Sequence, residues 1–124
     1  YGWSADNSPG FIYTMDWQMR PVVHSRMHWV AAEAVMAAYV LWRMTGEEKF
    51  LIDYDRWWSF IDRHVIDREF GSWHHELDSQ LQVIETTWPG KPDIYHSLNA
   101  CLLPLLPFQP SFIGAVTSME VNEM

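Results

Sequence analysis

One histidine lies where an acid/base group could act. His96 follows the loop Gly90-Lys91-Pro92 and opens an apolar run in the segment GKPDIYHSLNA. Histidine titrates near neutral pH, so it can take up and return a proton. At a helix N-terminus the dipole disfavours the imidazolium and leaves a neutral base, and the same helix end stabilises a developing oxyanion or enediolate. A purely structural histidine at the start of a helix is the alternative, and both interpretations remain open.

A carboxylate gives the second chemical signal. Glu33 is the single charged residue between Trp29 and Trp42, within an otherwise apolar helical pattern. A carboxylate in apolar surroundings must be partnered or neutralised. We therefore expect Glu33 either to make a buried structural hydrogen bond or to have a functional role.

The other five histidines carry weaker signals. His24 and His28 flank a hairpin arm, and His64 falls in the last turn of an amphipathic helix, where its charge suits the dipole. His74 and His75 are neighbours in a strand pattern, so at most one of them can face a pocket. Because the chain has no HExxH motif, we expect no metal ligands.

Two helices of different kinds must position these residues. Residues 28–44 predict a helix that is apolar on every side between Trp29 and Trp42 apart from Glu33, so we expect it to be buried on every side. Gly46 follows, the residue type that commonly ends a helix in the left-handed region. Residues 47–65 carry one apolar stripe, which predicts a half-exposed helix packed antiparallel to the first. A third, short apolar helix is expected from about Ile94 to Leu103, just before a proline.

Short strand patterns separate these helices. Segments 11–17 (FIYTMDW) and 20–26 (RPVVHSR) have the composition of a β-hairpin. Segments 72–78 (SWHHELD) and 82–88 (QVIETTW) predict a second hairpin across a polar turn. The tail from Phe108 gives no clear pattern.

The alternation of buried and amphipathic helices predicts two concentric helical layers. Successive inner helices would run parallel, so Trp29 and His96, each at a helix start, should meet at one mouth of the assembly. Three helices cannot close a ring. We therefore expect residues 1–124 to be one piece of a larger helical toroid.

Composition narrows the function classes. Eight Lys and Arg residues against sixteen Asp and Glu give a net charge of −8, which suits neither nucleic acid nor an anionic membrane. The longest apolar stretch is too short to span a bilayer. The lone Cys101 excludes an internal disulfide and a cysteine-rich zinc site, and its apolar neighbours predict burial.

Three segments together carry a family resemblance: HWVAAEAVMAAYVLWRMTGEEKF, WWSFIDRHVIDREFGSWHHELD and GKPDIYHSLNACLLPLLP. They resemble the C-terminal third of the N-acylglucosamine 2-epimerase superfamily, and the ending K-x-D-I-Y-H is most similar to its mannose isomerase and sulfoquinovose isomerase branch. The resemblance covers residues 10–107. It implies a mainly helical fold, the C-terminal part of a single (α/α)6-barrel catalytic domain with β-hairpin insertions.

The resemblance also implies roles for single residues. His96 matches a general acid/base that acts on the sugar, and Trp29 matches a pocket residue that can stack on an apolar sugar face. His75 and Pro92 stand where the sulfosugar branch has glutamines, which argues against sulfonate recognition. Lys91 replaces a pocket tryptophan of the disaccharide 2-epimerases. The expected substrate-binding residues are Trp29, Glu33, His75 and Pro92.

An aldose–ketose isomerase of the mannose/fructose type fits this pattern best. Such an enzyme needs neither metal nor cofactor, because a base removes the C2 proton of the open-chain aldose, a cis-enediolate forms, and the proton returns to C1. The family's second catalytic histidine lies in an H-x-x-E motif that this chain lacks. We therefore expect the chain to be inactive alone and to act with the remainder of a barrel on a monosaccharide.

Other classes remain open. They are an N-acylglucosamine or aldose 2-epimerase, a sulfoquinovose isomerase and a non-enzymatic helical toroid that binds other proteins. A carbohydrate-degrading enzyme would need a pair of catalytic carboxylates, which the chain does not offer. We expect a cytoplasmic protein and leave open a homo-oligomer.

Overall fold

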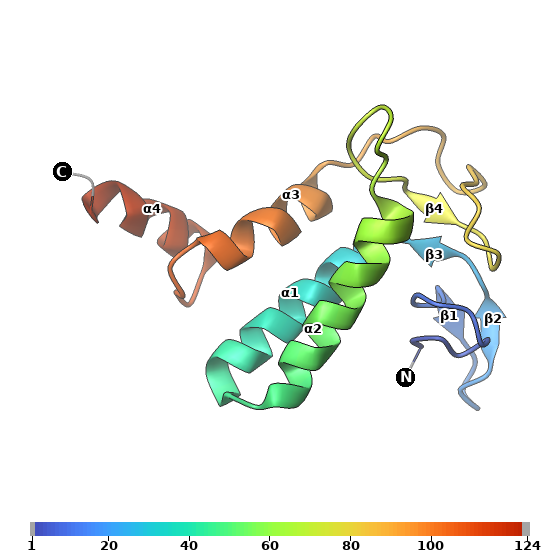
Figure 1. Cartoon of the computed structure of the whole chain (residues 1–124), viewed down its shortest axis with the longest axis horizontal. Helices are drawn as coiled ribbons and strands as arrows, with labels where there is room; N and C mark the ends of the chain where they lie inside the picture. The colour runs from blue at the N-terminus through green and yellow to red at the C-terminus, as the bar shows by residue number, and fades with distance from the viewer. Residues whose placement is uncertain (1, 123–124) are drawn as a thin grey trace.

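The computed structural model describes residues 2–122 and is mainly helical (Figure 1). The helices are α1 (His28–Thr45), α2 (Glu48–Phe60), α3 (Tyr95–Leu102) and α4 (Phe112–Asn122). The strands are β1 (Thr14–Met15), β2 (Pro21–Val23), β3 (Arg26–Met27) and β4 (Glu76–Leu77). A π-helical turn, Ile61–Val65, extends α2, and a 3-10 turn, Leu103–Leu105, follows α3.

The antiparallel pair of α1 and α2 confirms the two long helices expected from the sequence (Figure 1). Gly46 ends α1 with φ 71°, in the left-handed region, and its backbone N–H donates to the carbonyl of Trp42 at 2.8 Å. A residue with a side chain would be strained in this conformation. The reversal therefore depends on glycine, and α2 begins two residues later.

The hydrophobic core lies between the helix pair and the start of the following loop. Small residues of α1 let α2 approach closely, and the larger side chains of the π-helical turn fill the space opposite them. Tyr54, Trp57 and Trp58 pack against this core from the half-buried face of α2. The core residues are Ala31, Ala32, Val35, Phe60, Ile61, Val65, Trp73, Leu77 and Ala100.

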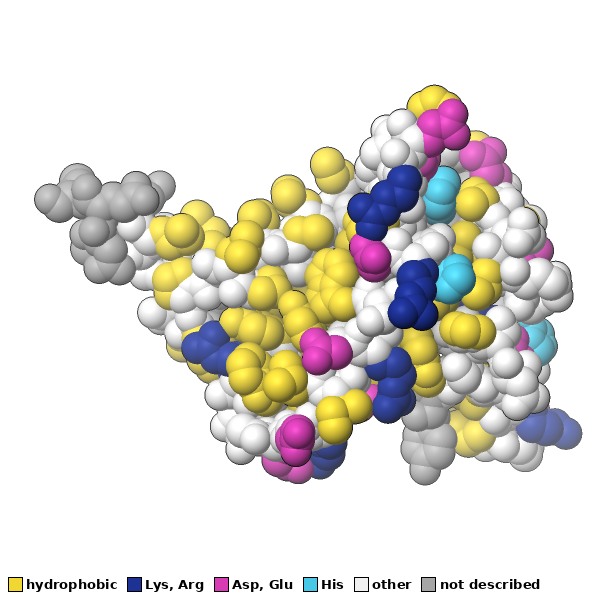
Figure 2. Space-filling model, viewed as in Figure 1, with side chains coloured by type: hydrophobic (Ala, Val, Ile, Leu, Met, Phe, Trp, Pro, Cys, Tyr) yellow, Lys and Arg dark blue, Asp and Glu magenta, His cyan; other side chains and the backbone are white. Residues whose placement is uncertain are grey.

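One face of α1 contradicts the expectation that this helix is buried on every side. Glu33, Ala37, Leu41 and Met44, which follow helical spacing, are exposed. Among residues 2–122 no element covers this face. Cys101 on α3 is exposed too, so its predicted burial was wrong. Figure 2 shows hydrophobic side chains gathered over α3 and α4, whereas charged side chains follow the middle of the molecule.

The first predicted hairpin is confirmed, and the second forms over a shorter length than predicted. β1 and β2 pair antiparallel, although each strand is shorter than its pattern. Segments 72–78 and 82–88 meet in an antiparallel bridge between Leu77 and Val83, and the Asp78 N–H donates to the Gln82 carbonyl at 2.9 Å, while β4 also pairs with β3. The pairing ends there because the Glu76 side chain accepts hydrogen bonds from the backbone N–H groups of Thr86 and Thr87 at 3.0 and 2.9 Å. These donors are therefore not available to a strand ladder.

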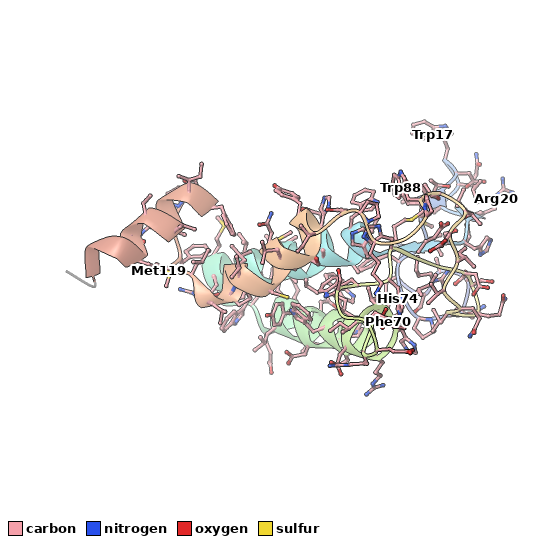
Figure 3. All side chains as sticks on the ribbon, turned by 90° about the horizontal axis from the view of Figure 1, so that it is seen from above. Trp17, Arg20, Phe70, His74, Trp88 and Met119 are labelled. Atoms are coloured by element: carbon pink, nitrogen blue, oxygen red, sulfur yellow. The ribbon has the colours of Figure 1, made fainter. Side chains whose placement is uncertain are left out.

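The two extremes of the molecule project from the core. Figure 3 shows α4 extending away with Met119 on it, and Trp17 standing out from the β1–β2 hairpin at the other end. The tail that gave no pattern thus forms a helix. None of the helices in residues 2–122 combines the length and hydropathy that crossing a membrane requires.

Candidate active site

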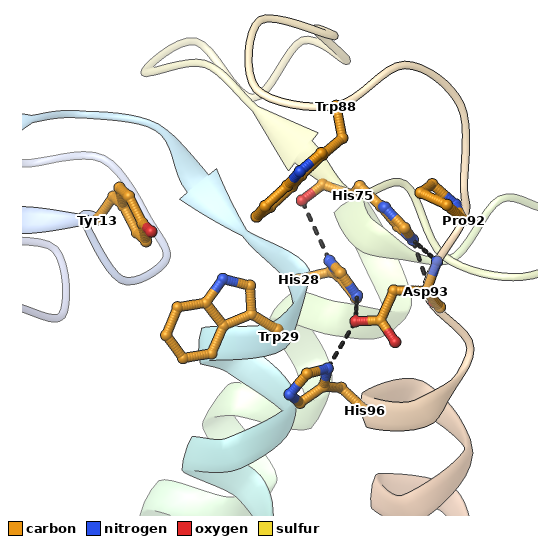
Figure 4. A pocket seen from close by; sticks show the side chains of 8 residues that line it. All are labelled: Tyr13, His28, Trp29, His75, Trp88, Pro92, Asp93 and His96. Atoms are coloured by element: carbon orange, nitrogen blue, oxygen red, sulfur yellow. Dashed lines mark hydrogen bonds and ion pairs between the residues drawn. The ribbon is translucent and has the colours of Figure 1, made fainter.

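A cleft of about 530 Å³ opens where α1 and α3 begin (Figure 4). The β1–β2 hairpin, β4 and the loop before α3 complete its walls. The residues that line it are Tyr13, His28, Trp29, His75, Trp88, Pro92, Asp93 and His96.

The structure brings together most of the site residues predicted from the sequence. Trp29, His75, Pro92 and His96 all line the cleft. The rings of Trp29 and His96 lie 6.0 Å apart, which confirms that α1 and α3 begin at the same mouth. Glu33 is not part of the lining, and its side chain is 53% exposed, but its Oε1 lies 3.8 Å from His96 Nε2.

His96 is held by a carboxylate that the sequence interpretation left without a role. His96 is the second residue of α3, and its Nδ1 lies 2.6 Å from Asp93 Oδ2. Since Asp93 also accepts the backbone N–H of Tyr95 at 2.9 Å, it is fixed to the first residue of the helix. Two acidic groups, Asp93 and Glu33, therefore face the His96 ring, whereas the sequence indicated only the helix dipole.

His28 was expected to flank a hairpin arm, and the structure places it inside the site. It is the first residue of α1 and is 2% exposed. Its Nε2 lies 3.1 Å from the same Asp93 oxygen that contacts His96, and its Nδ1 lies 3.3 Å from the carbonyl of His75. One carboxylate oxygen thus stands between two imidazole rings.

His75 packs against His28 and contacts the backbone of Asp93. Its ring stacks on His28 with centroids 4.0 Å apart and an interplanar angle of 6°. Its Nε2 lies 3.1 Å from the backbone carbonyl of Asp93 and 3.3 Å from the Asp93 nitrogen, so one tautomer donates to the former and the other accepts from the latter. His74, its neighbour, faces Asp67 outside the cleft. As predicted, only one of the two adjacent histidines reaches the pocket.

Burial and contacts shift the proton equilibria of two groups. Burial acts to raise the pKa of Asp93, but the hydrogen bond and charge of His96, with the Tyr95 N–H, outweigh it and the pKa lies below its ordinary value. Burial, followed by repulsion from His75, lowers the pKa of His28, against the opposing effects of the His75 carbonyl and Asp93. At neutral pH Asp93 is therefore a carboxylate and His28 a neutral ring.

The same three side chains offer ligand atoms for a metal ion. His28, Asp93 and His96 present nitrogen and oxygen atoms that all lie within 4.8 Å of one another. Around tetrahedral zinc, ligands bound at 2.0–2.1 Å lie about 3.3 Å apart. The 2.6 Å between His96 Nδ1 and Asp93 Oδ2 is the spacing of a charge-assisted hydrogen bond. In this arrangement a hydrogen bond joins His96 to Asp93.

Aromatic side chains form the other side of the cleft. The Tyr13 and Trp29 rings meet edge to face at 6.1 Å, and Trp88 stands above them (Figure 4). Lys91 turns away from the cleft, because its Nζ contacts the Asp67 carboxylate and donates to the Gly71 carbonyl at 2.7 Å. Trp88 thus provides the aromatic surface on this loop.

Some residues of the cleft were not predicted from the sequence, although two of them have a partial sequence signal. Asp93 precedes His96 by three residues, a spacing that brings side chains together at a helix start. His28 directly precedes the apolar helix that carries Trp29. Tyr13 reaches the cleft from the start of the β1–β2 hairpin and Trp88 from the loop before α3, and no sequence pattern indicated that either lines a site.

The N-acylglucosamine 2-epimerase (GlcNAc 2-epimerase) family model matches residues 1–100. The chain belongs to this family.

Two relatives and one solved structure carry names more specific than that of the family. The chain is 46% identical over 120 residues to the D-mannose isomerase of Pseudomonas cannabina pv. alisalensis, with 97% of the chain covered. It is 50% identical over 119 residues to the D-mannose isomerase of Thermobifida fusca, with 95% covered. The chain spans 29% of the length of each. A crystal structure of D-mannose isomerase matches 85% of this chain and 27% of its own length, with TM-score 0.75 and 28% identity.

Proposed function

We propose that this chain forms part of an aldose–ketose isomerase that interconverts mannose and fructose. The carrying observation is the His96–Asp93 pair at the floor of an aromatic-walled cleft. With a proton on Nδ1 shared with Asp93, the lone pair on His96 Nε2 is free to act as a base. The identity to D-mannose isomerases over almost the whole chain supports the choice of sugar.

The proposed reaction is a proton shuttle. His96 Nε2 removes the C2 proton of the open-chain aldose, and the electron pair forms a cis-enediolate. The hydroxyl proton passes from O2 to O1, and a proton is returned to C1 to give the ketose. Within residues 2–122, the other imidazoles of the cleft, His28 and His75, are buried in mutual contacts. We therefore assign the second acid/base group to the remainder of an (α/α)6 barrel.

The walls of the cleft suit a neutral monosaccharide. Trp29 offers a flat apolar face on which a sugar ring can stack. Pro92 and His75 shape the opposite wall, and neither offers the amide that the sulfosugar branch has at these positions. Glu33, at the edge of the cleft beside His96 Nε2, would accept a hydrogen bond from a sugar hydroxyl.

The exposed stripe on α1 supports the proposal that more protein completes the fold. Leu41 and Met44 are 41% and 69% exposed, and Leu98 on α3 is 47% exposed. Apolar surface of this kind is usually covered. We propose that the rest of the barrel covers it, so the chain alone would be inactive and would associate. A cytoplasmic location, which suits the free thiol of Cys101, belongs to the same proposal.

The test measures fructose formation from mannose by the full-length polypeptide that contains this chain. Replacing His96→Asn is expected to lower kcat by roughly 10²–10⁴ with little change in folding. His74→Asn is the matched control, because His74 lies outside the cleft, and it should leave kcat unchanged. A chelator should not reduce the rate if protons alone join the three side chains.

Two results would overturn this proposal. One is an intact enzyme that converts mannose to glucose but forms no fructose, which would make it a 2-epimerase. The other is a folded His96→Asn variant with near-normal kcat, which would leave His96 as a structural residue.

A further inference from the structure

We propose that Asp93 and His28 are positioning residues that fix the tautomer of His96, with Asp93 acting directly and His28 acting through Asp93. This inference rests on the proposed isomerase function. It assigns a role to a buried histidine and a carboxylate that need not touch the sugar.

The hydrogen-bonding capacity of Asp93 is taken up by the protein. Its Oδ1 accepts the Tyr95 N–H at 2.9 Å, and its Oδ2 lies 2.6 Å from His96 Nδ1 and 3.1 Å from His28 Nε2. A carboxylate can only accept, so each of these contacts requires a proton on the partner. His96 must therefore carry its proton on Nδ1, which leaves Nε2 unprotonated.

His28 is suited to keep that carboxylate in place. Its backbone N–H donates to the His75 carbonyl at 3.0 Å, and its ring stacks on the His75 ring with 2% exposure. A neutral imidazole has one N–H, and the charged Asp93 oxygen at 3.1 Å is a better acceptor than the carbonyl at 3.3 Å. Since Nε2–H then points at Asp93, this oxygen stays oriented while His96 exchanges protons with the substrate.

An amide in place of Asp93 cannot make the same three contacts. Asp93→Asn has one oxygen for three donors, and because the Tyr95 backbone N–H is a fixed donor that retains this oxygen, the NH2 group would face the imidazoles. His96 would then favour the tautomer with the proton on Nε2, which cannot act as a base. We expect kcat to fall by roughly 10²–10⁴ while KM changes less than about threefold.

His28 allows a matched pair of variants. His28→Gln keeps an N–H donor near the position of Nε2 and should retain most of kcat, whereas His28→Leu removes the donor and should lower kcat by at least roughly tenfold. Because His28 acts only through Asp93, His28→Leu should have little further effect on kcat in an Asp93→Asn background. A purely structural role would give additive losses and no distinction between Gln and Leu at matched stability.

The experiment uses the intact enzyme with mannose as substrate and thermal unfolding as the folding control. If Asp93→Asn fails to fold, Asp93→Ala tests the same idea, because added formate should restore part of kcat and equimolar chloride should not. Any of three results would overturn the inference: a kcat of Asp93→Asn within about threefold of wild type, additive effects of the His28 and Asp93 variants on kcat, or no rescue of Asp93→Ala by formate. Absence of isomerase activity in the wild type would instead count against the proposed function.

Discussion

The α1–α2 pair and the loop from Ile66 to Asp93 meet at the same core but are stabilised by different interactions. The helix pair is held by apolar side chains, with Ala32 and Ile61 fully buried where α1 and α2 meet. The loop has little regular structure and is held by carboxylates. Glu76 binds Thr86 and Thr87, and Asp67 accepts the backbone N–H groups of residues 69 and 70.

Because of this difference, we expect folding stability and catalysis to depend on different parts of the molecule. Non-directional apolar contacts give the helix pair its free energy of folding. Directional hydrogen bonds give the loop a defined shape, and that loop carries Trp88, Pro92 and Asp93 into the cleft. A change in the core between the two helices, away from His28 and Trp29, should therefore act on unfolding alone, and a change in the loop should also act on turnover.

The largest loss of stability is expected from Ile61→Ala. Ile61 is fully buried, and its removal would leave a cavity between α1 and the π-helical turn. We expect the free energy of unfolding to fall by roughly 2–5 kcal/mol, as measured by urea denaturation. The kcat of the fraction that remains folded should be unchanged. A reduced kcat would show that the helix pair also shapes the cleft.

A smaller loss of stability, with an effect on catalysis, is expected from Glu76→Gln. Glu76 is 1% exposed and accepts three hydrogen bonds from Thr86 and Thr87. An amide leaves part of this set unsatisfied, at a cost of roughly 1–3 kcal/mol. Because the bonds define the loop that bears Trp88, kcat/KM for mannose should fall as well. Unchanged kcat/KM would mean that the loop holds its shape without Glu76.

The smallest effect is expected from Lys91→Met. The Lys91 contact is the main reason that the pKa of Asp67 lies well below its ordinary value, followed by the hydrogen bond from the Phe70 N–H. A lowered carboxyl pKa contributes stability that is present above the unfolded-state pKa of about 4 and is lost as the pH falls through the folded value. Wild type should therefore be slightly more stable than Lys91→Met at pH 7. That advantage should shrink as the pH falls below about 4, and a constant difference would contradict the ion pair as its source.

The helix pair could be predicted from the sequence because its pattern is local and periodic. Apolar spacing gave the two helices, and Gly46 gave the reversal between them. The all-round burial of α1 was not met, since its Glu33–Met44 face lies open within the described residues. The apolar pattern indicates which face of a helix can be buried, but the element that covers this face need not be close in the sequence.

The loop and the centre of the site could be predicted only in part. His96 was found through its place at a helix start and its match to a family motif. The predicted strand 82–88 is cut short because the Glu76 side chain accepts the Thr86 and Thr87 N–H groups, which no local pattern encodes. The convergence of His28 on Asp93 joins residues that are 65 positions apart, and it follows from the packing of α1 against α3.

The central claim is that Asp93 holds His96 with its proton on Nδ1 and leaves Nε2 free toward the cleft. Nitrogen-15 NMR of histidine-labelled intact enzyme at neutral pH tests it, with the His96→Asn variant used to assign the His96 signals. The account predicts a protonated Nδ1 and an unprotonated Nε2 in the wild type, and the opposite tautomer in Asp93→Asn. A wild-type His96 protonated on Nε2, or the same tautomer in both proteins, would contradict it.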